Sequence, residues 1–121
     1  MLEVIGLSKH WDRQPVLQDL ALHVERGQHV LIMGPSGCGK STLLHLLARL
    51  TEADAGRIEF AGQSISTMGN PAEYRLRNLG LVFQDVQLVE SLTVRQNIAL
   101  ICAHGDGSHM GVDMLMASLG L

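Results

Sequence analysis

Residues 29–50, HVLIMGPSGCGKSTLLHLLARL, decide the fold of this chain. The apolar run at the start of this stretch is typical of a strand buried on both faces of a parallel sheet. The leucines between residues 43 and 50 recur at spacings that place them on one face of a helix. We therefore expect a strand over 29–34, a glycine-rich loop, and a helix over 40–50.

The loop between them meets the pattern G-x-x-x-x-G-K-[ST] through Gly34, Gly39, Lys40 and Ser41, with a strand before it and a helix after it. Glycines let backbone N–H groups converge on phosphate oxygens, and a helix N-terminus adds a positive dipole end. Lys40 is expected to reach the β- and γ-phosphates, and Ser41 to ligate Mg²⁺. Thr42 is expected to meet the α-phosphate. The predicted phosphate-binding residues are Gly34, Pro35, Ser36, Gly37, Cys38, Gly39, Lys40, Ser41 and Thr42. The competing interpretation is a glycine turn that happens to contain a lysine.

The rest of the chain alternates strand and helix patterns. The predicted strands are 2–11 and 16–25, which form an antiparallel start, then 56–62 and a second buried strand, 79–84. The predicted helices are 71–78, with Pro71 at its first position, 92–103, and a terminal amphipathic segment, 110–121. Residues 63–70 are expected to form a loop.

Composition limits the class of protein. The chain has 121 residues, 46% of them apolar and 17% charged, which fits one folded domain. Its formal charge is −3 and its only lysines are Lys9 and Lys40, so no nucleic-acid partner is expected. No apolar run reaches the roughly 20 residues of a membrane span, and no secretory signal is present, which predicts a cytoplasmic protein.

Cysteine and histidine positions favour neither a disulfide nor a metal site. Cys38 and Cys102 are far apart in the sequence and are expected to be free thiols rather than a bridge. The six histidines are dispersed, and the nearest pair, His104 and His109, lacks a strong ligand pattern. We interpret these two as solvated loop residues.

The sequence resembles the first half of an ATP-binding-cassette (ABC) nucleotide-binding domain over nearly its whole length. The likeness rests on Trp11, GPSGCGKST, and three further segments: AGRIEFAGQSI (55–65), LGLVFQD (79–85) and LTVRQNIAL (92–100). Within the family, residues 75–100 are similar to ATPases of lipoprotein-release and macrolide-export systems and their cell-division relatives. The resemblance implies a transport ATPase subunit that binds ATP and Mg²⁺ and drives a membrane permease, which would dock around residues 84–98.

The resemblance also implies two further site residues. An aromatic residue upstream of the loop stacks on adenine in this family, and Trp11, 29 residues before Lys40, matches it. A glutamine at the end of a core strand contacts Mg²⁺ or the attacking water, and Gln84 matches it. The alternatives are that Trp11 is an ordinary packing anchor and that Gln84 is a strand-end hydrogen bonder.

Several parts that the family needs for hydrolysis are not found in this sequence. Catalysis there requires a strand ending in Asp-Glu, whose glutamate activates water. The nearest candidate, Asp85, is preceded by Gln84 rather than by a second carboxylate. The Leu-Ser-Gly-Gly-Gln signature and the switch histidine are also missing. Hydrolysis by this chain alone is therefore not expected, and no catalytic residue is assigned.

These observations predict an incomplete α/β P-loop NTPase core of the RecA-like type with an N-terminal antiparallel β subdomain. The expected parts are 1–28 (antiparallel start), 29–84 (P-loop core) and 85–121 (start of a helical subdomain). The expected partners are a permease at the inner face of the cell membrane and a second ATP-binding domain or complementing chain. Self-association through exposed sheet edges is also expected. The alternatives are a non-catalytic nucleotide-binding or interaction module and another P-loop enzyme such as a small-molecule kinase.

Overall fold

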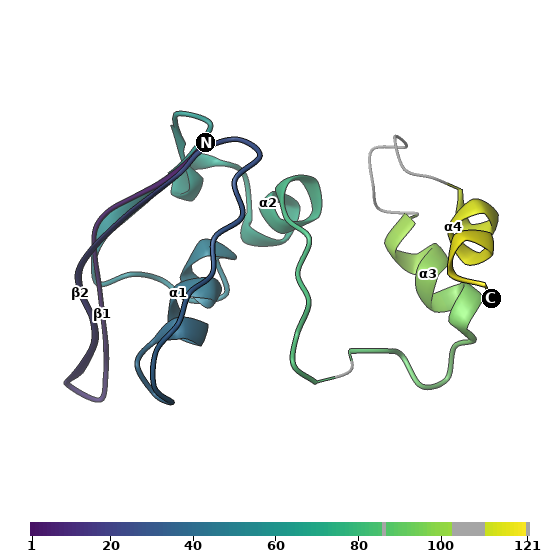
Figure 1. Cartoon of the computed structure of the whole chain (residues 1–121), viewed down its shortest axis with the longest axis horizontal. Coiled ribbons are helices and arrows are strands. Elements are labelled where there is room, and N and C mark those ends of the chain that lie inside the picture. Colours follow the sequence, from purple (N-terminus) through teal and green to yellow (C-terminus); the bar gives the residue numbers. More distant parts are fainter. Residues whose placement is uncertain (86, 103–110, 121) are drawn as a thin grey trace. The chain divides into compact units, whose positions relative to one another are not determined.

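The computed structural model describes residues 1–85, 87–102 and 111–120, which form two compact units, Met1–Arg75 and Leu76–Leu121 (Figure 1). The first unit contains β1 (Leu2–Trp11), β2 (Gln14–Val24), α1 (Lys40–Leu47), β3 (Ala55–Phe60), β4 (Gln63–Ser64) and a 3₁₀ turn (Ile65–Thr67). Helix α2 (Pro71–Asn78) spans the boundary, and the second unit contains α3 (Val94–Cys102) and α4 (Val112–Leu119).

The four strands form one antiparallel sheet in the order β2-β1-β3-β4. β1 and β2 are joined by a two-residue turn, Asp12–Arg13, in which both residues have positive φ angles of 48° and 69°. A type I′ turn requires positive φ at both central positions, and its backbone twist matches the right-handed twist of the two strands. The predicted antiparallel start and the strand predicted over 56–62 are confirmed, and β4 was not predicted.

The core of this unit lies between the sheet and α1. Val4 and Leu7 of β1 and Ile58 of β3 are buried, as are Leu43 and Leu46 of α1. The two leucines are three apart, so they lie on one face of α1, as the spacing predicts. Burial of such side chains stabilises a fold by roughly 1.5–3 kcal/mol each.

Side chains from α2 hold the C-terminal end of α1. The Tyr74 hydroxyl donates to the carbonyl of Leu47 at 3.1 Å, and the Arg75 guanidinium donates to the carbonyls of Ala48 and Arg49 at 3.3 and 3.2 Å. Such carbonyls have no partner inside their own helix. The helix predicted over 40–50 ends at Leu47 because Arg49 is left-handed (φ of 52°), and the N–H groups of Leu50 and Arg49 donate back to the carbonyls of His45 and Leu46 at 2.8 and 3.1 Å.

Two capped helices follow the predicted positions. The Asn70 carboxamide accepts from the Glu73 N–H at 2.9 Å, and Pro71 occupies the first position of α2. In the second unit, Thr93 and Gln96 form a reciprocal cap: Gln96 Oε1 accepts from the Thr93 N–H at 2.9 Å, and Thr93 Oγ1 accepts from the Gln96 N–H at 3.3 Å.

The prediction of two parallel strands over 29–34 and 79–84 is wrong. Neither segment is paired, and several side chains are largely exposed, including Leu31 (81%), Met33 (80%) and Val82 (97%). A strand of a parallel sheet exists only when a neighbour accepts its hydrogen bonds, and the strands found in the described part of the chain pair with one another. The apolar pattern therefore indicates that these two segments tend to be buried. It does not identify the strand with which each of them would pair. No helix in the described ranges is long and apolar enough to cross a membrane.

Candidate phosphate-binding site

The glycine-rich stretch folds into a tight loop immediately before α1. Gly37 and Gly39 have φ angles of 82° and 92°, in the left-handed region that glycine adopts without strain. The Cys38 N–H donates to the Pro35 carbonyl at 3.4 Å, which turns the chain back on itself. The loop therefore closes over a short distance and delivers its last residue to the helix.

The Lys40 ammonium lies across this loop. Its Nζ donates to the carbonyls of Gly34 at 2.7 Å and Pro35 at 2.6 Å, and lies 3.6 Å from the Cys38 sulfur. Hydrogen bonds from a charged donor are stronger than those between neutral groups. The positive charge is thus held among the residues of the loop rather than extended into solvent.

The first turn of α1 carries unpaired hydrogen-bond donors. The first N–H with an intrahelical partner is that of Leu43, which donates to Gly39 at 2.9 Å. The N–H groups of Lys40, Ser41 and Thr42 precede it, and the first turn contains no acidic residue. The hydroxyl of Ser41 is on an exposed residue and has no partner in the part of the chain that the structure describes. This arrangement favours an anion at the helix N-terminus.

Gly39 also connects the loop to the β hairpin. A Cβ at this position would lie 2.9 Å from both the Val16 carbonyl oxygen and Leu17 Cδ2, so the loop packs directly on β2. Val16 is the extra residue of an irregular pairing in which Lys9 faces Leu17 and His10 faces Pro15. In Figure 1 the loop before α1 and the turn between β1 and β2 lie at the same end of this unit.

Trp11 is the last residue of β1, next to this turn. Its side chain is 48% exposed, and the Lys9 ammonium lies over the indole, 4.9 Å from the ring centroid. The hairpin that carries Trp11 is the one that Gly39 contacts. The predicted adenine-stacking residue and the predicted phosphate loop are therefore attached to the same hairpin.

The structure does not bring every predicted residue together. Gln84 and Asp85 are exposed and belong to the second unit, so the roles considered for them stay untested. Cys38 is an exposed free thiol, whereas the side chain of Cys102 is not described. His104 and His109 fall outside the described residues, and among those described no three His, Cys, Asp or Glu side chains form a metal-binding group.

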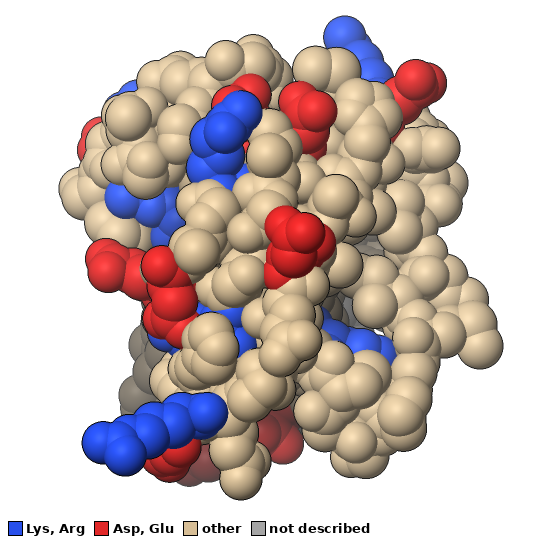
Figure 2. All heavy atoms as spheres, turned by 90° about the vertical axis from the view of Figure 1, so that its left-hand side faces the viewer, with Lys and Arg blue, Asp and Glu red and all other residues tan. Residues whose placement is uncertain are grey.

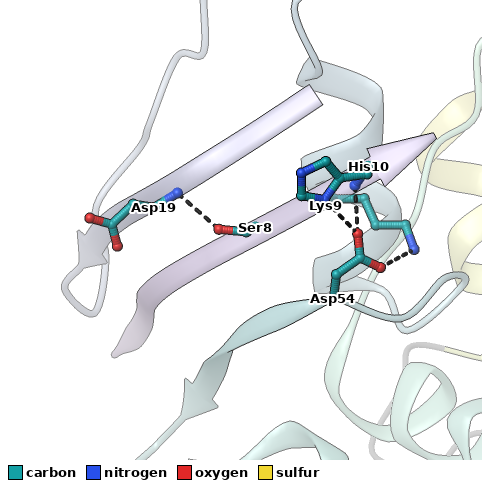
Figure 3. A network of polar contacts seen from close by, with 5 residues as sticks. All are labelled: Ser8, Lys9, His10, Asp19 and Asp54. Atoms are coloured by element: carbon teal, nitrogen blue, oxygen red, sulfur yellow. Dashed lines mark hydrogen bonds and ion pairs between the residues drawn. The ribbon is translucent and has the colours of Figure 1, made fainter. Parts of the chain in front are cut away.

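Sequence reasoning missed a polar network on β1. The Asp54 carboxylate accepts hydrogen bonds from the His10 backbone N–H at 2.6 Å, from His10 Nδ1 at 3.0 Å and from Lys9 Nζ at 3.1 Å (Figure 3). The hydrogen bond from the His10 backbone, followed by that from Lys9, lowers the pKa of Asp54 to about 2. In the sequence the segment ADAG indicates only a helix break, so no signal pointed to this role.

Two surface features bear on the choice of ligand. Acidic and basic side chains are interspersed on the face shown in Figure 2, without a patch of one sign. A cavity of about 360 Å³ lies between the sheet, α1 and α2, and its lining includes Leu7, Leu46, Arg49 and Ile65 but no residue of the glycine loop. The glycine loop is therefore separate from this cavity.

A glycine loop that encloses a lysine and opens into a helix N-terminus defines the class of P-loop proteins. The ABC transporter family model matches residues 17–121. The chain belongs to this family, and its fold class is that of the α/β P-loop domains.

Curated relatives point the same way. Over 98 residues the chain is 43% identical to the sulfate/thiosulfate import ATP-binding protein CysA of Bordetella pertussis and 40% identical to that of Pseudomonas aeruginosa. The matched segment covers 81% of this chain but only 27% and 29% of those relatives. The narrower likeness to lipoprotein-release and macrolide-export ATPases stays a prediction, because these two relatives are named as sulfate/thiosulfate import proteins.

Solved structures match at the level of the fold. The ATP-binding cassette MJ0796, solved as a dimer in a post-hydrolysis state with ADP and Pi, has a TM-score of 0.81 and 25% identity. That match covers 99% of this chain and 55% of the other. A second structure, of an ATP-binding subunit of an ABC transporter, has a TM-score of 0.79 and 31% identity, over 90% of this chain and 44% of that one.

Proposed function

We propose that this chain is the part of an ABC transporter ATPase subunit that binds the phosphates and base of Mg-ATP. The observation that carries the proposal is the Lys40 ammonium held 2.6–2.7 Å from two loop carbonyls, at the N-terminus of a helix whose first N–H groups are unpaired. A fixed positive charge beside converging N–H donors is what a polyphosphate requires.

The residues present fit this ligand. Lys40 would neutralise the β- and γ-phosphates, and the loop N–H groups would bind their oxygens. The exposed Ser41 hydroxyl has no described partner and is free to ligate Mg²⁺, an ion that prefers oxygen donors. Trp11, half exposed on the hairpin that contacts Gly39, would stack on the adenine ring. For Gln84, the proposed contact with Mg²⁺ rests on the resemblance to the family alone.

We do not propose that this chain hydrolyses ATP. The sequence contains no Asp-Glu pair to activate water, so we propose that the chain binds ATP without hydrolysing it. Transport would require the rest of an ATP-binding domain, a second such domain and a membrane permease at the cytoplasmic face. A phosphate-release assay that detects ATP turnover, abolished by Lys40→Ala, would contradict the non-catalytic part alone.

Mg-ATP titration followed by the fluorescence of Trp11 tests the binding proposal, because this is the only tryptophan of the chain. We expect a saturable change in the parent protein and its loss in Lys40→Ala. Arg26→Ala is the matched control, since it removes one positive charge from an exposed residue outside the loop. An equal saturable change in Lys40→Ala would show that the nucleotide is not bound at this loop.

A further inference from the structure

Lys9 and Trp11 are two residues apart on β1, so they lie on the same face of the strand. The Lys9 ammonium is 4.9 Å from the centroid of the Trp11 ring. A cation at this distance is attracted by the negative face of the ring, and tryptophan is the best partner for it. One face of the indole is therefore covered by a cation, whereas the side chain as a whole remains 48% exposed.

Asp54 fixes the position of that cation. Its carboxylate accepts from Lys9 Nζ at 3.1 Å and is itself held by the His10 backbone N–H at 2.6 Å and His10 Nδ1 at 3.0 Å (Figure 3). The Asp54 N–H donates to the Ser8 carbonyl at 2.9 Å. Asp54 is thus bonded to the backbone of β1 on both sides of Lys9, through its own N–H to Ser8 and through its carboxylate to His10.

The Lys9 side chain is more enclosed than its partner. It is 12% exposed, whereas the Asp54 side chain is 40% exposed. A long side chain that is largely enclosed and bonded at its tip has few alternative rotamers, so its ammonium stays near the ring. The Asp54 carboxylate is ionised at neutral pH, and its lowered pKa of about 2 extends the ionised range to more acidic pH.

We propose that Lys9 and Asp54 are positioning residues for Trp11: the ammonium holds one face of the indole, and the other face is presented to the planar base of the nucleotide. This inference rests on the proposed function, because it assigns the means by which that site recognises the base. The benefit is preorganisation, since the side-chain entropy of Trp11 is lost before the ligand arrives. Neither residue touches the ligand.

Calorimetric titration of the full chain with Mg-ATP and with magnesium tripolyphosphate separates recognition of the base from recognition of the phosphates. Lys9→Met keeps an unbranched stem of four atoms and removes the charged ammonium. We expect it to weaken Mg-ATP binding by roughly two- to fivefold and to leave tripolyphosphate binding unchanged. Lys9→Arg, which restores a cation over the ring, is expected to recover most of the loss. Arg26→Met controls for the change in net charge.

The outcomes distinguish this inference from the function on which it rests. If Lys9→Met weakens both ligands equally, or neither, the positioning role is overturned while the phosphate site stands. If the parent binds neither ligand, the proposed function is wrong and the inference falls with it.

A second measurement needs no ligand. Collisional quenching of Trp11 fluorescence by acrylamide is expected to increase in Lys9→Met and in Asp54→Asn, because the second face of the indole becomes accessible. Lys9→Arg is expected to remain close to the parent. Unchanged quenching in both Lys9→Met and Asp54→Asn would show that the cation does not hold the ring and would overturn the inference.

Discussion

Gly39 shows how one residue links the loop to the sheet. Its φ angle of 92° excludes most side chains, and a Cβ would lie 2.9 Å from the Val16 carbonyl oxygen, a backbone atom that cannot move away alone. Gly37 has a similar φ of 82°, but nothing lies within 4 Å of its Cβ position. The two glycines therefore share the requirement for a left-handed backbone, and only Gly39 is also required for close packing.

We expect Gly39→Ala to destabilise the protein more than Gly37→Ala. The left-handed conformation costs roughly 1–2 kcal/mol for an alanine in either position. Gly39→Ala also has to relieve the contact with β2, which adds about 1–3 kcal/mol. Urea unfolding curves of the two variants provide the comparison, and equal losses would contradict the packing role of Gly39.

The Tyr74 hydroxyl links α2 to the C-terminal end of α1 through a hydrogen bond. The residue is 2% exposed, and burial raises the pKa of its phenol above the ordinary 10.0. The neutral form is therefore favoured in the folded protein. The stability that comes from this raised pKa of Tyr74 is complete below pH 10 and is lost as the pH rises through the raised value.

Tyr74→Phe removes the hydrogen bond to the Leu47 carbonyl while keeping the ring. We expect a loss of about 0.5–1.5 kcal/mol in the free energy of unfolding at neutral pH. Above pH 10 the difference from the parent should shrink, because the variant has no phenol to ionise. A difference that grows with pH above 10 would argue against the buried neutral phenol.

At the scale of elements, the helix ends follow local chemistry that the sequence shows. The Thr93–Gln96 cap opens α3, and we expect Thr93→Ala to weaken it by about 1 kcal/mol. Amide hydrogen exchange over 94–102 should then be roughly fivefold faster. Ser91→Ala removes a hydroxyl for which no hydrogen bond is described and serves as the control. Equal acceleration in both variants would show that the cap does not stabilise α3.

Predictability from sequence follows the range of the interactions. The start of α2 at Pro71 and the existence of β3 were predicted because caps, turns and alternation are local. The glycine loop was predicted because all its residues are consecutive. Asp54 was not, because its hydrogen bonds reach back more than 40 residues to β1. The prediction of strands over 29–34 and 79–84 failed for the same reason. The pattern of side chains within a segment does not show which other segment would accept its backbone hydrogen bonds.

At the scale of the whole molecule, the unpaired segments 29–34 and 79–84 are an association hazard. Unpaired backbone beside exposed apolar side chains such as Leu31 and Val82 favours pairing with another chain. We expect the parent to show concentration-dependent association in sedimentation velocity, and Leu31→Lys or Val82→Lys to reduce it. Leu119→Lys changes an exposed leucine of α4 and serves as the control. Association that Leu119→Lys reduces to the same extent would indicate non-specific aggregation.

The aromatic residues are divided unequally between the two units. The only tryptophan and the only tyrosine, Trp11 and Tyr74, both belong to Met1–Arg75, and Leu76–Leu121 contains neither. Intrinsic fluorescence therefore follows the unfolding of the first unit alone, whereas far-UV circular dichroism also records α3 and α4. Coincident curves from the two methods would mean that the units unfold as one cooperative block, and separate curves would resolve two transitions without any added label.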